Sequence, residues 1–183
     1  MNGENLQLVR LTTATVIKPF NCGHREINGF LFENAIEHTK ELLAITYLYE
    51  DDRNTIAYLS VANDSIRIKD APSPNWFRRV VLKELPHEKR IKYPSYPAVK
   101  VGRFGVSNEY SRQGIGTSLM DWVKNYFLDK NKTGCRFVTV DAYKESIEFY
   151  EKNGFKFLTD KDKDEETRLM YFDLKIFQSF LNL

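Results

Sequence analysis

Apolar positions in the first third of the chain follow a strand pattern, then a helical pattern, and then two further strand patterns. Three leucines within residues 6–11 alternate with polar residues, which predicts a strand. Apolar residues within residues 27–38 recur at spacings of three and four, which predicts one amphipathic helix. Two runs rich in β-branched and aromatic residues, 42–50 and 55–62, flank a turn-forming segment, so we expect an antiparallel hairpin.

The pattern weakens in residues 63–97, where five prolines interrupt it and only residues 76–85 have the spacing of a short helix. We therefore expect an irregular excursion. The excursion is also basic, since residues 76–92 hold two glutamates against six basic residues: Arg78, Arg79, Lys83, Lys89, Arg90 and Lys92. This cluster is either an ordinary solvated face or a patch that binds an anionic partner.

Strand and helix patterns alternate in the rest of the chain. A strand over residues 98–106 contains Gly102 and Gly105, and interior glycines often mark a bulge or a close backbone approach. The order continues with a helix over 114–128, a strand over 137–140, a helix over 144–152, strands over 155–158 and 168–174, and a short apolar tail over 176–183.

The composition is that of a folded soluble domain, because 42% of the 183 residues are apolar and 28% are charged. A formal net charge of +2 does not mark the whole chain as a nucleic-acid binder. No apolar run approaches the roughly 18 residues that a membrane span requires. Cys22 and Cys135 lie far apart without metal-ligand neighbours, so we expect no disulfide framework, no metal site and a reducing cytoplasm.

The glycine turn, residues 112–117 (Arg-Gln-Gly-Ile-Gly-Thr), lies between a predicted strand and a predicted helix. Glycines at a helix start allow backbone N–H groups to converge on an anion, and the helix dipole favours negative charge there. The turn could hold a phosphate or a pyrophosphate. The same sequence is also typical of a tight strand-to-helix turn that binds no ligand. The spacings of a P-loop and of a dinucleotide-binding fingerprint are both absent from the turn.

A second candidate segment, residues 146–155, places Phe149 and Tyr150 near the end of a predicted helix. From the residues alone, Tyr150 is either a packing residue at the edge of the core or a catalytic group.

Taken together, these segments resemble the GNAT family of N-acetyltransferases, whose signature is Q/R-x-x-G-x-G/A before a helix and F-Y-x-x-x-G-F at the end of a later helix. The resemblance covers residues 98–158. It implies that the glycine turn holds the pyrophosphate of acetyl-CoA through main-chain amides and that the preceding strand holds the pantetheine arm. The implied cofactor-binding residues are Phe104, Gly105, Val106, Ser111, Arg112, Gln113, Gly114, Ile115, Gly116 and Thr117.

The same resemblance implies that Tyr150 is the general acid that protonates the departing coenzyme A thiolate. Two positions depart from the family pattern. Ser111 stands where the family usually has Gln or Arg, and Tyr143 stands where an asparagine is often found.

Residues 20–31 resemble the F-x-C-G-x-x-x-L-D-x-F-L opening of the toxin-type branch of the family, with Asn28 in place of the aspartate. Members of that branch acetylate the α-amino group of aminoacyl-tRNA, so the likeness implies charged tRNA as the acceptor. Cys22 in this segment is either a nucleophile or, without a paired histidine, a small buried residue. The candidate phosphate contacts are Arg78, Arg79, Lys89 and Arg90.

The resemblance implies one N-acetyltransferase domain over residues 1–183. Its fold would be α/β, with a mixed and mainly antiparallel sheet, helices on both faces and a splay at the cofactor site. The expected parts are an N-terminal strand, helix and hairpin (1–62), the basic excursion (63–97), the acetyl-CoA-binding core (98–158) and a C-terminal strand and tail (159–183).

Three functions remain open: acetyl transfer to the α-amine of aminoacyl-tRNA, acetyl transfer to a protein or small-molecule amine, and non-catalytic binding of acyl-CoA. Competition by tRNA separates the first two, and the presence of Tyr150 speaks against the third. The sequence leaves open whether an antitoxin protein binds the chain and whether two copies form a homodimer.

Overall fold

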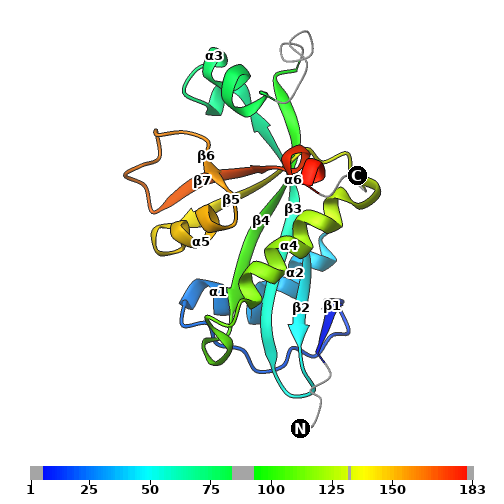
Figure 1. The fold of residues 1–183 in the computed structure, drawn as a ribbon. Coiled ribbons are helices and arrows are strands. Elements are labelled where there is room, and N and C mark those ends of the chain that lie inside the picture. The colour runs from blue at the N-terminus through cyan, green and yellow to red at the C-terminus, as the bar shows by residue number, and fades with distance from the viewer. Residues whose placement is uncertain (1–5, 84–92, 132, 181–183) are drawn as a thin grey trace. The chain divides into compact units, whose positions relative to one another are not determined.

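The computed structural model describes residues 6–83, 93–131 and 133–180 (Figure 1). Its strands form one sheet in the order β1-β2-β3-β4-β5-β7-β6, which confirms the α/β class. The strands are β1 (Gln7–Arg10), β2 (Ile45–Glu50), β3 (Thr55–Arg67), β4 (Ser95–Val106), β5 (Phe137–Tyr143), β6 (Lys156–Phe157) and β7 (Thr167–Asp173). The α-helices are α1 (Arg25–Gly29), α2 (Ala35–Lys40), α3 (Pro74–Trp76), α4 (Ile115–Leu128), α5 (Ile147–Lys152) and α6 (Leu174–Phe180).

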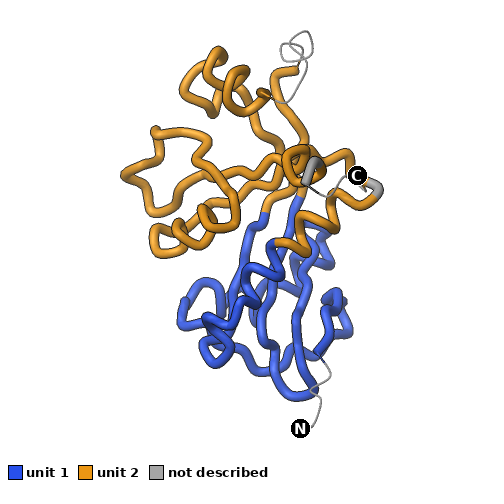
Figure 2. Tube along the Cα trace, in the orientation of Figure 1, with its two compact units in different colours: residues 1–62, 101–120 blue, residues 63–100, 121–183 orange. Residues whose placement is uncertain are grey.

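The chain divides into two compact units, each built from two separate stretches of sequence (Figure 2). Unit 1 contains residues 1–62 and 101–120, and unit 2 contains residues 63–100 and 121–183. Strands β3 and β4 and helix α4 contribute residues to both units. Because each unit draws on both halves of the chain, neither corresponds to one of the sequence segments expected above.

In unit 1, strands β1, β2 and β3 pair antiparallel in sequence order, with the predicted hairpin between β2 and β3. Leu48 and Tyr58 face each other across the hairpin, and both are fully buried. The Asp51 carboxylate closes the turn, because it accepts the N–H groups of Arg53 at 2.7 Å and Asn54 at 2.6 Å.

Helices α1 and α2 of unit 1 are joined by a π-helical turn, Phe30–Asn34, so the segment is not the single regular helix that the spacing predicted. The Ala35 N–H donates to the Phe30 carbonyl, five residues earlier in the chain. The Tyr58 hydroxyl of β3 donates to the Ile27 carbonyl at 2.6 Å and ties the helical segment to the sheet. Figure 1 shows α2 behind these strands and the first turns of α4 in front of them, which places helices on both faces.

The irregular excursion predicted over residues 63–97 is wrong in part. Strand β3 continues to Arg67, and β4 begins at Ser95. The polar residues in this part of β3 do not show a strand pattern in the sequence. Asp64 is tolerated in the strand because its carboxylate accepts the Thr139 hydroxyl at 2.5 Å, within unit 2. Residues 84–92 of the stretch lie outside the described residues.

The short helix predicted over residues 76–85 is present, but it begins earlier, with α3, and continues into a second π-helical turn, Phe77–Val81. Ser73 sets the start, because its hydroxyl accepts the Trp76 N–H at 3.1 Å. The segment packs into the core of unit 2 through three fully buried side chains: Phe77, Val81 and Leu82.

In unit 2, β5 pairs antiparallel with β7, and the short β6 pairs with the other edge of β7. Residues that the sequence pattern assigned to an apolar tail form helix α6. Asp173 starts this helix, since its carboxylate accepts the Lys175 N–H at 2.9 Å. The same carboxylate pairs with Arg136 at 2.8 Å. The sequence pattern did not predict the start of α6, because its capping residue, Asp173, is also the last residue of β7.

Candidate functional site

The glycine turn of unit 1 has the backbone geometry of an anion site. Arg112 and Gly114 both have positive φ, 61° and 82°, which turns successive N–H groups to one side. The first intrahelical bond of α4 joins the Ser118 N–H to the Gly114 carbonyl at 3.0 Å. The N–H groups of Ile115, Gly116 and Thr117 therefore come before the hydrogen-bond ladder of the helix, at an end that solvent reaches.

Two residues of the predicted cofactor-binding set use their side chains in hydrogen bonds within the loop. The Ser111 hydroxyl donates to the Asn108 carbonyl at 2.9 Å. The Gln113 amide donates to the Glu109 carbonyl at 3.2 Å. Main-chain amides, rather than these side chains, are therefore the groups that the turn presents to an anion.

The end of β4, also in unit 1, carries the predicted residues Phe104, Gly105 and Val106. A Cβ atom at Gly105 would lie 2.8 Å from a methyl group of Ile27 and 3.1 Å from the Phe20 ring. Packing against α1 is thus sufficient to require glycine at this position. At Gly102 a Cβ atom would meet nothing closer than the Ser60 carbonyl oxygen, at 3.8 Å.

Tyr150 lies in unit 2, on α5, and is only 5% exposed. Its ring makes edge contacts with Phe149 and Phe155, at centroid distances of 5.1 and 5.4 Å. Burial raises the pKa of the Tyr150 phenol, because the charged phenolate is poorly solvated there. The phenol therefore stays protonated at neutral pH, which is the state that a proton donor needs. The same shift makes it a weaker acid.

The structure groups the predicted cofactor-binding residues in unit 1 and places Tyr150 in unit 2. Of the predicted phosphate contacts, Arg78 and Arg79 lie on the helical segment after α3, in unit 2. Arg79 is exposed, whereas Arg78 is half-buried and donates to the Asn75 side chain at 3.4 Å. Lys89, Arg90 and Lys92 lie outside the described residues.

An open groove in unit 1, of about 1060 Å³, was missed by the sequence analysis. It runs along α1, the first π-helical turn and α2, and it carries charges of both signs: Arg25, Glu26, Glu33 and Arg103. The Arg103 guanidinium lies 5.4 Å from the centre of the Phe30 ring and donates to the Gly102 carbonyl at 2.7 Å. Its Nε atom is buried and has no hydrogen-bond partner among the described residues. The sequence feature that could have indicated this groove is Arg103, a charged residue inside the largely apolar strand β4.

Asn28 organises the start of α1. Its side-chain oxygen accepts the Cys22 N–H at 3.0 Å, and its amide donates to the Asn21 side chain at 2.8 Å. The Cys22 thiol also lies 3.2 Å from the Asn28 oxygen. Burial raises the pKa of this thiol, so little thiolate forms at neutral pH. These contacts favour the interpretation of Cys22 as a packing residue.

No group of His, Cys, Asp and Glu residues within 6–83, 93–131 and 133–180 is placed to hold a metal ion. Across the same residues, no helix is both long enough and apolar enough to span a membrane.

Residues 78–157 match the family model of the acetyltransferase (GNAT) domain. The matched stretch includes both the glycine turn and Tyr150. This stretch of the chain is therefore similar to the acetyltransferase domain of the GNAT family. No curated protein sequence matches the chain.

Solved structures share this fold along almost the whole chain. A Tyr-to-Phe variant of KacT has a TM-score of 0.76 at 20% sequence identity, over 96% of this chain and 98% of that one. A bacterial toxin has a TM-score of 0.78 at 16% identity, over 98% of this chain and 96% of that one. AtaT complexed with acetyl-methionyl-tRNAfMet has a TM-score of 0.73 at 20% identity, over 97% and 99%. The predicted fold is thus confirmed, and solved structures of this fold include a bacterial toxin.

Proposed function

We propose that this protein transfers the acetyl group of acetyl-CoA to the α-amine of an aminoacyl-tRNA, in the cytoplasm. The observation that carries the proposal is the glycine turn. Its amides at Ile115, Gly116 and Thr117, which precede the hydrogen-bond ladder at the start of a 14-residue helix, suit the pyrophosphate of the cofactor. A complex called AtaTR, which has this fold, has been solved with acetyl-CoA bound.

When bound, acetyl-CoA supplies an acetyl thioester: the neutral acceptor nitrogen bonds to the carbonyl carbon and loses a proton to water, the carbon–sulfur bond breaks, and the thiolate takes up a proton. In this proposal the protein orients the reactants, and Tyr150 donates a hydrogen bond or a proton to the departing sulfur. Its raised pKa favours a hydrogen bond to the developing thiolate over complete transfer. No covalent enzyme intermediate is needed, and Cys22 takes no part.

The groove of unit 1 supports an acceptor that carries both charges. Arg25 and Arg103 suit a phosphate, and Glu26 and Glu33 suit an amine. The end of a charged tRNA has both groups close together. An α-amine, with a reference pKa near 7.7, is also partly neutral at cellular pH and hence nucleophilic. AtaT, a structural neighbour, has been solved with acetyl-methionyl-tRNAfMet.

The test is transfer of radiolabelled acetyl to a pool of charged tRNAs at low and high salt. Label on tRNA, with a Michaelis constant that rises steeply with salt, is expected because Lys and Arg contacts to phosphate release counterions. Acidic substitution of Arg78 and Arg79 should raise that constant without weakening acetyl-CoA binding. Label on a peptide or polyamine, with none on tRNA, would support the second candidate, a protein or small-amine acetyltransferase.

The same assay distinguishes a non-catalytic acyl-CoA-binding module from both transferases. Such a module would bind acetyl-CoA and transfer no label to any amine. The proposal is also compatible with binding of an antitoxin protein and with formation of a homodimer. The neighbour AtaT has been solved with the C-terminus of the antitoxin AtaR, and size measurement of the purified chain would test self-association.

A further inference from the structure

The glycine turn of unit 1 contains one strained backbone position. Arg112 has a φ of 61°, in the left-handed region that residues with a side chain rarely adopt. Such a conformation persists only where the surrounding structure fixes it. The contacts of the neighbouring residues therefore decide whether the amides of the turn are already oriented before an anion arrives.

The loop that precedes the turn, residues 107–111, is anchored to other parts of unit 1. The N–H groups of Ser107 and Asn108 donate at 2.8 and 2.9 Å to carbonyls of β3 and of the segment before α1. Tyr110 adds a side-chain anchor, because its hydroxyl donates to Asp51 Oδ2 at 3.2 Å. Of these three anchors, the Tyr110 hydroxyl lies closest in sequence to the turn.

Asp51 is itself firmly held in the turn of the β2–β3 hairpin. Its Oδ1 atom accepts the N–H groups of Arg53 and Asn54, and its carbonyl accepts Lys18 Nζ at 2.7 Å. The two N–H groups are the main reason why the pKa of Asp51 is lowered, and the Tyr110 hydroxyl adds to the effect. The side chain is therefore a carboxylate at neutral pH, and its hydrogen bond to Tyr110 is charge-assisted.

We propose that Tyr110 and Asp51 are positioning residues for the cofactor: their hydrogen bond holds the glycine turn in its anion-binding conformation before acetyl-CoA binds. A turn that is already ordered lowers the entropic cost of binding. The inference rests on the proposed function, since it takes the turn to be the site of the acetyl-CoA pyrophosphate. It assigns the hairpin turn, 59 residues earlier in the chain than Tyr110, a part in cofactor affinity.

Tyr110→Phe removes the hydrogen bond and keeps the ring. The dissociation constant for acetyl-CoA should rise by about threefold to tenfold, less than the full worth of a charge-assisted hydrogen bond, because the two backbone anchors remain. The Michaelis constant for acetyl-CoA should rise with it. Turnover at saturating acetyl-CoA should not change, since the bound cofactor restores the turn. Calorimetry and steady-state kinetics measure these quantities.

Substitutions of Asp51 separate the anchor from a general loss of stability. Asp51→Asn should keep affinity near that of wild type, because the amide oxygen can cap the hairpin turn and the amide N–H can donate to the Tyr110 hydroxyl. Asp51→Ala should weaken binding about as much as Tyr110→Phe does. The two changes together should weaken binding no further, because both remove the same hydrogen bond.

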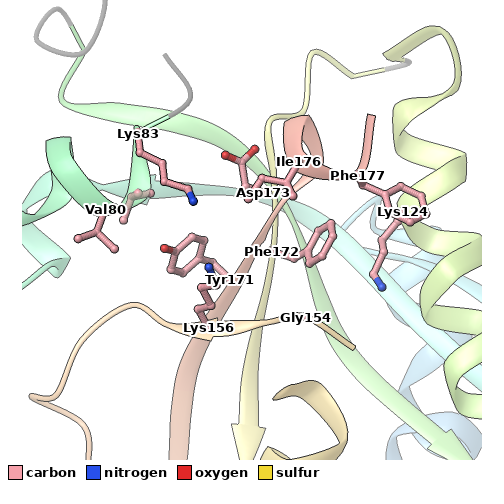
Figure 3. A pocket seen from close by; sticks show the side chains of 11 residues that line it. Val80, Lys83, Lys124, Gly154, Lys156, Tyr171, Phe172, Asp173, Ile176 and Phe177 are labelled. Atoms are coloured by element: carbon pink, nitrogen blue, oxygen red, sulfur yellow. The ribbon is translucent and has the colours of Figure 1, made fainter. Parts of the chain in front are cut away.

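Tyr171→Phe is the matched control. Tyr171 lies in unit 2, where it lines a cavity of about 240 Å³ (Figure 3), and the variant likewise removes one phenol hydroxyl. It should leave acetyl-CoA affinity unchanged, and melting temperatures will show that each variant folds. Wild-type affinity in Tyr110→Phe would overturn the inference. So would losses from Tyr110→Phe and Asp51→Ala that add up in the double variant.

Backbone dynamics of the free protein distinguish failure of this inference from failure of the proposed function. NMR order parameters of the amides of residues 112–114 should fall in Tyr110→Phe from about 0.85, typical of rigid backbone, toward 0.6. Absence of acetyl-CoA binding to wild type, with this loosening present, would refute the proposed function and leave the anchor standing. Unchanged order parameters would overturn the anchor, whether or not acetyl-CoA binds.

Discussion

The two units expose their functional groups in opposite ways. Unit 1 presents charge and bare backbone to solvent, at the glycine turn and in the open groove around Arg103. Unit 2 keeps titratable side chains among aromatic rings: Tyr150 between Phe149 and Phe155, and Lys124 over Phe172. Backbone amides at a helix start and a groove with charges of both signs suit recognition of a charged substrate. A buried phenol that stays neutral suits a single proton-donating step.

This contrast has a physical origin. A main-chain amide needs no low-dielectric surroundings to bind phosphate, since the helix end already orients its dipole. A tyrosine acid depends on its surroundings, because burial disfavours the phenolate and so raises the pKa of Tyr150. Variants in unit 1 should therefore change binding constants, and variants at Tyr150 should change turnover.

The largest effect is expected from Tyr150→Phe. Turnover should fall by roughly tenfold to a thousandfold, with acetyl-CoA affinity nearly unchanged, because the hydroxyl acts only in the transition state. Steady-state kinetics and calorimetry measure the two quantities. Because the pKa of Tyr150 is raised, wild-type activity should show no alkaline loss at or below the ordinary tyrosine pKa of about 10. Full turnover in the variant would make Tyr150 a packing residue.

Gly116→Val should act in the opposite way. The added side chain blocks the approach of phosphate to the first-turn amides, so acetyl-CoA affinity should fall by about tenfold to a hundredfold, the equivalent of one or two charge-assisted hydrogen bonds. Calorimetric titration measures this. Ser118→Ala is the control, since Ser118 already belongs to the hydrogen-bonded ladder of α4. Equal affinity of wild type and the valine variant would place the cofactor elsewhere.

Arg103→Ala tests the groove. The variant should raise the Michaelis constant for the acceptor by about tenfold, because a charge-assisted hydrogen bond from the guanidinium is lost. Acetyl-CoA affinity should not change. Arg53→Ala removes the same charge from an exposed position on the hairpin of unit 1 and should have no effect. A fall in turnover alone would break the division of roles between the units.

Asn28→Asp should reduce stability by about 1 kcal/mol, since the amide that donates to Asn21 is lost while the acceptor for Cys22 remains. Urea unfolding measures the change. A variant as stable as wild type would mean that the Asn21 side chain reorients to donate to the new carboxylate.

The smallest effect is expected from Cys22→Ser, which should keep full turnover because the raised pKa of Cys22 leaves little thiolate at neutral pH. Cys135, whose pKa burial raises to about 11, should resist alkylation until the pH approaches that value. Mass spectrometry after iodoacetamide treatment follows both thiols. Loss of activity in the serine variant would return Cys22 to the list of catalytic candidates.

Much of the fold was predictable because local periodicity and packing agree. The helix predicted over residues 114–128 is α4 (Ile115–Leu128), and the β2–β3 hairpin formed around a turn whose Asp51 cap is visible in the sequence. Prediction failed where a distant side chain supplies the partner. Asp64 is acceptable within β3 only because Thr139, 75 residues away, donates to it.

The candidate site divides in the same way. The anion turn was predictable, because glycine and helix-start chemistry are local. The hydrogen bonds that Ser111 and Gln113 make within the loop were not predictable, since the sequence does not show which carbonyl a side chain reaches. The groove around Arg103 escaped because it joins a strand to a helical segment more than 60 residues earlier.

The π-helical turns affect how this chain can be compared with its relatives. Each one accommodates a residue more than an α-helix would, and one residue corresponds to about 100° of rotation. A sequence alignment that pairs residues 25–40 with an uninterrupted helix will therefore be shifted by one position after Asn34, unless it opens a gap there. The same holds after Val81. Structure-guided alignment across these two turns avoids such a shift wherever a relative has an uninterrupted helix.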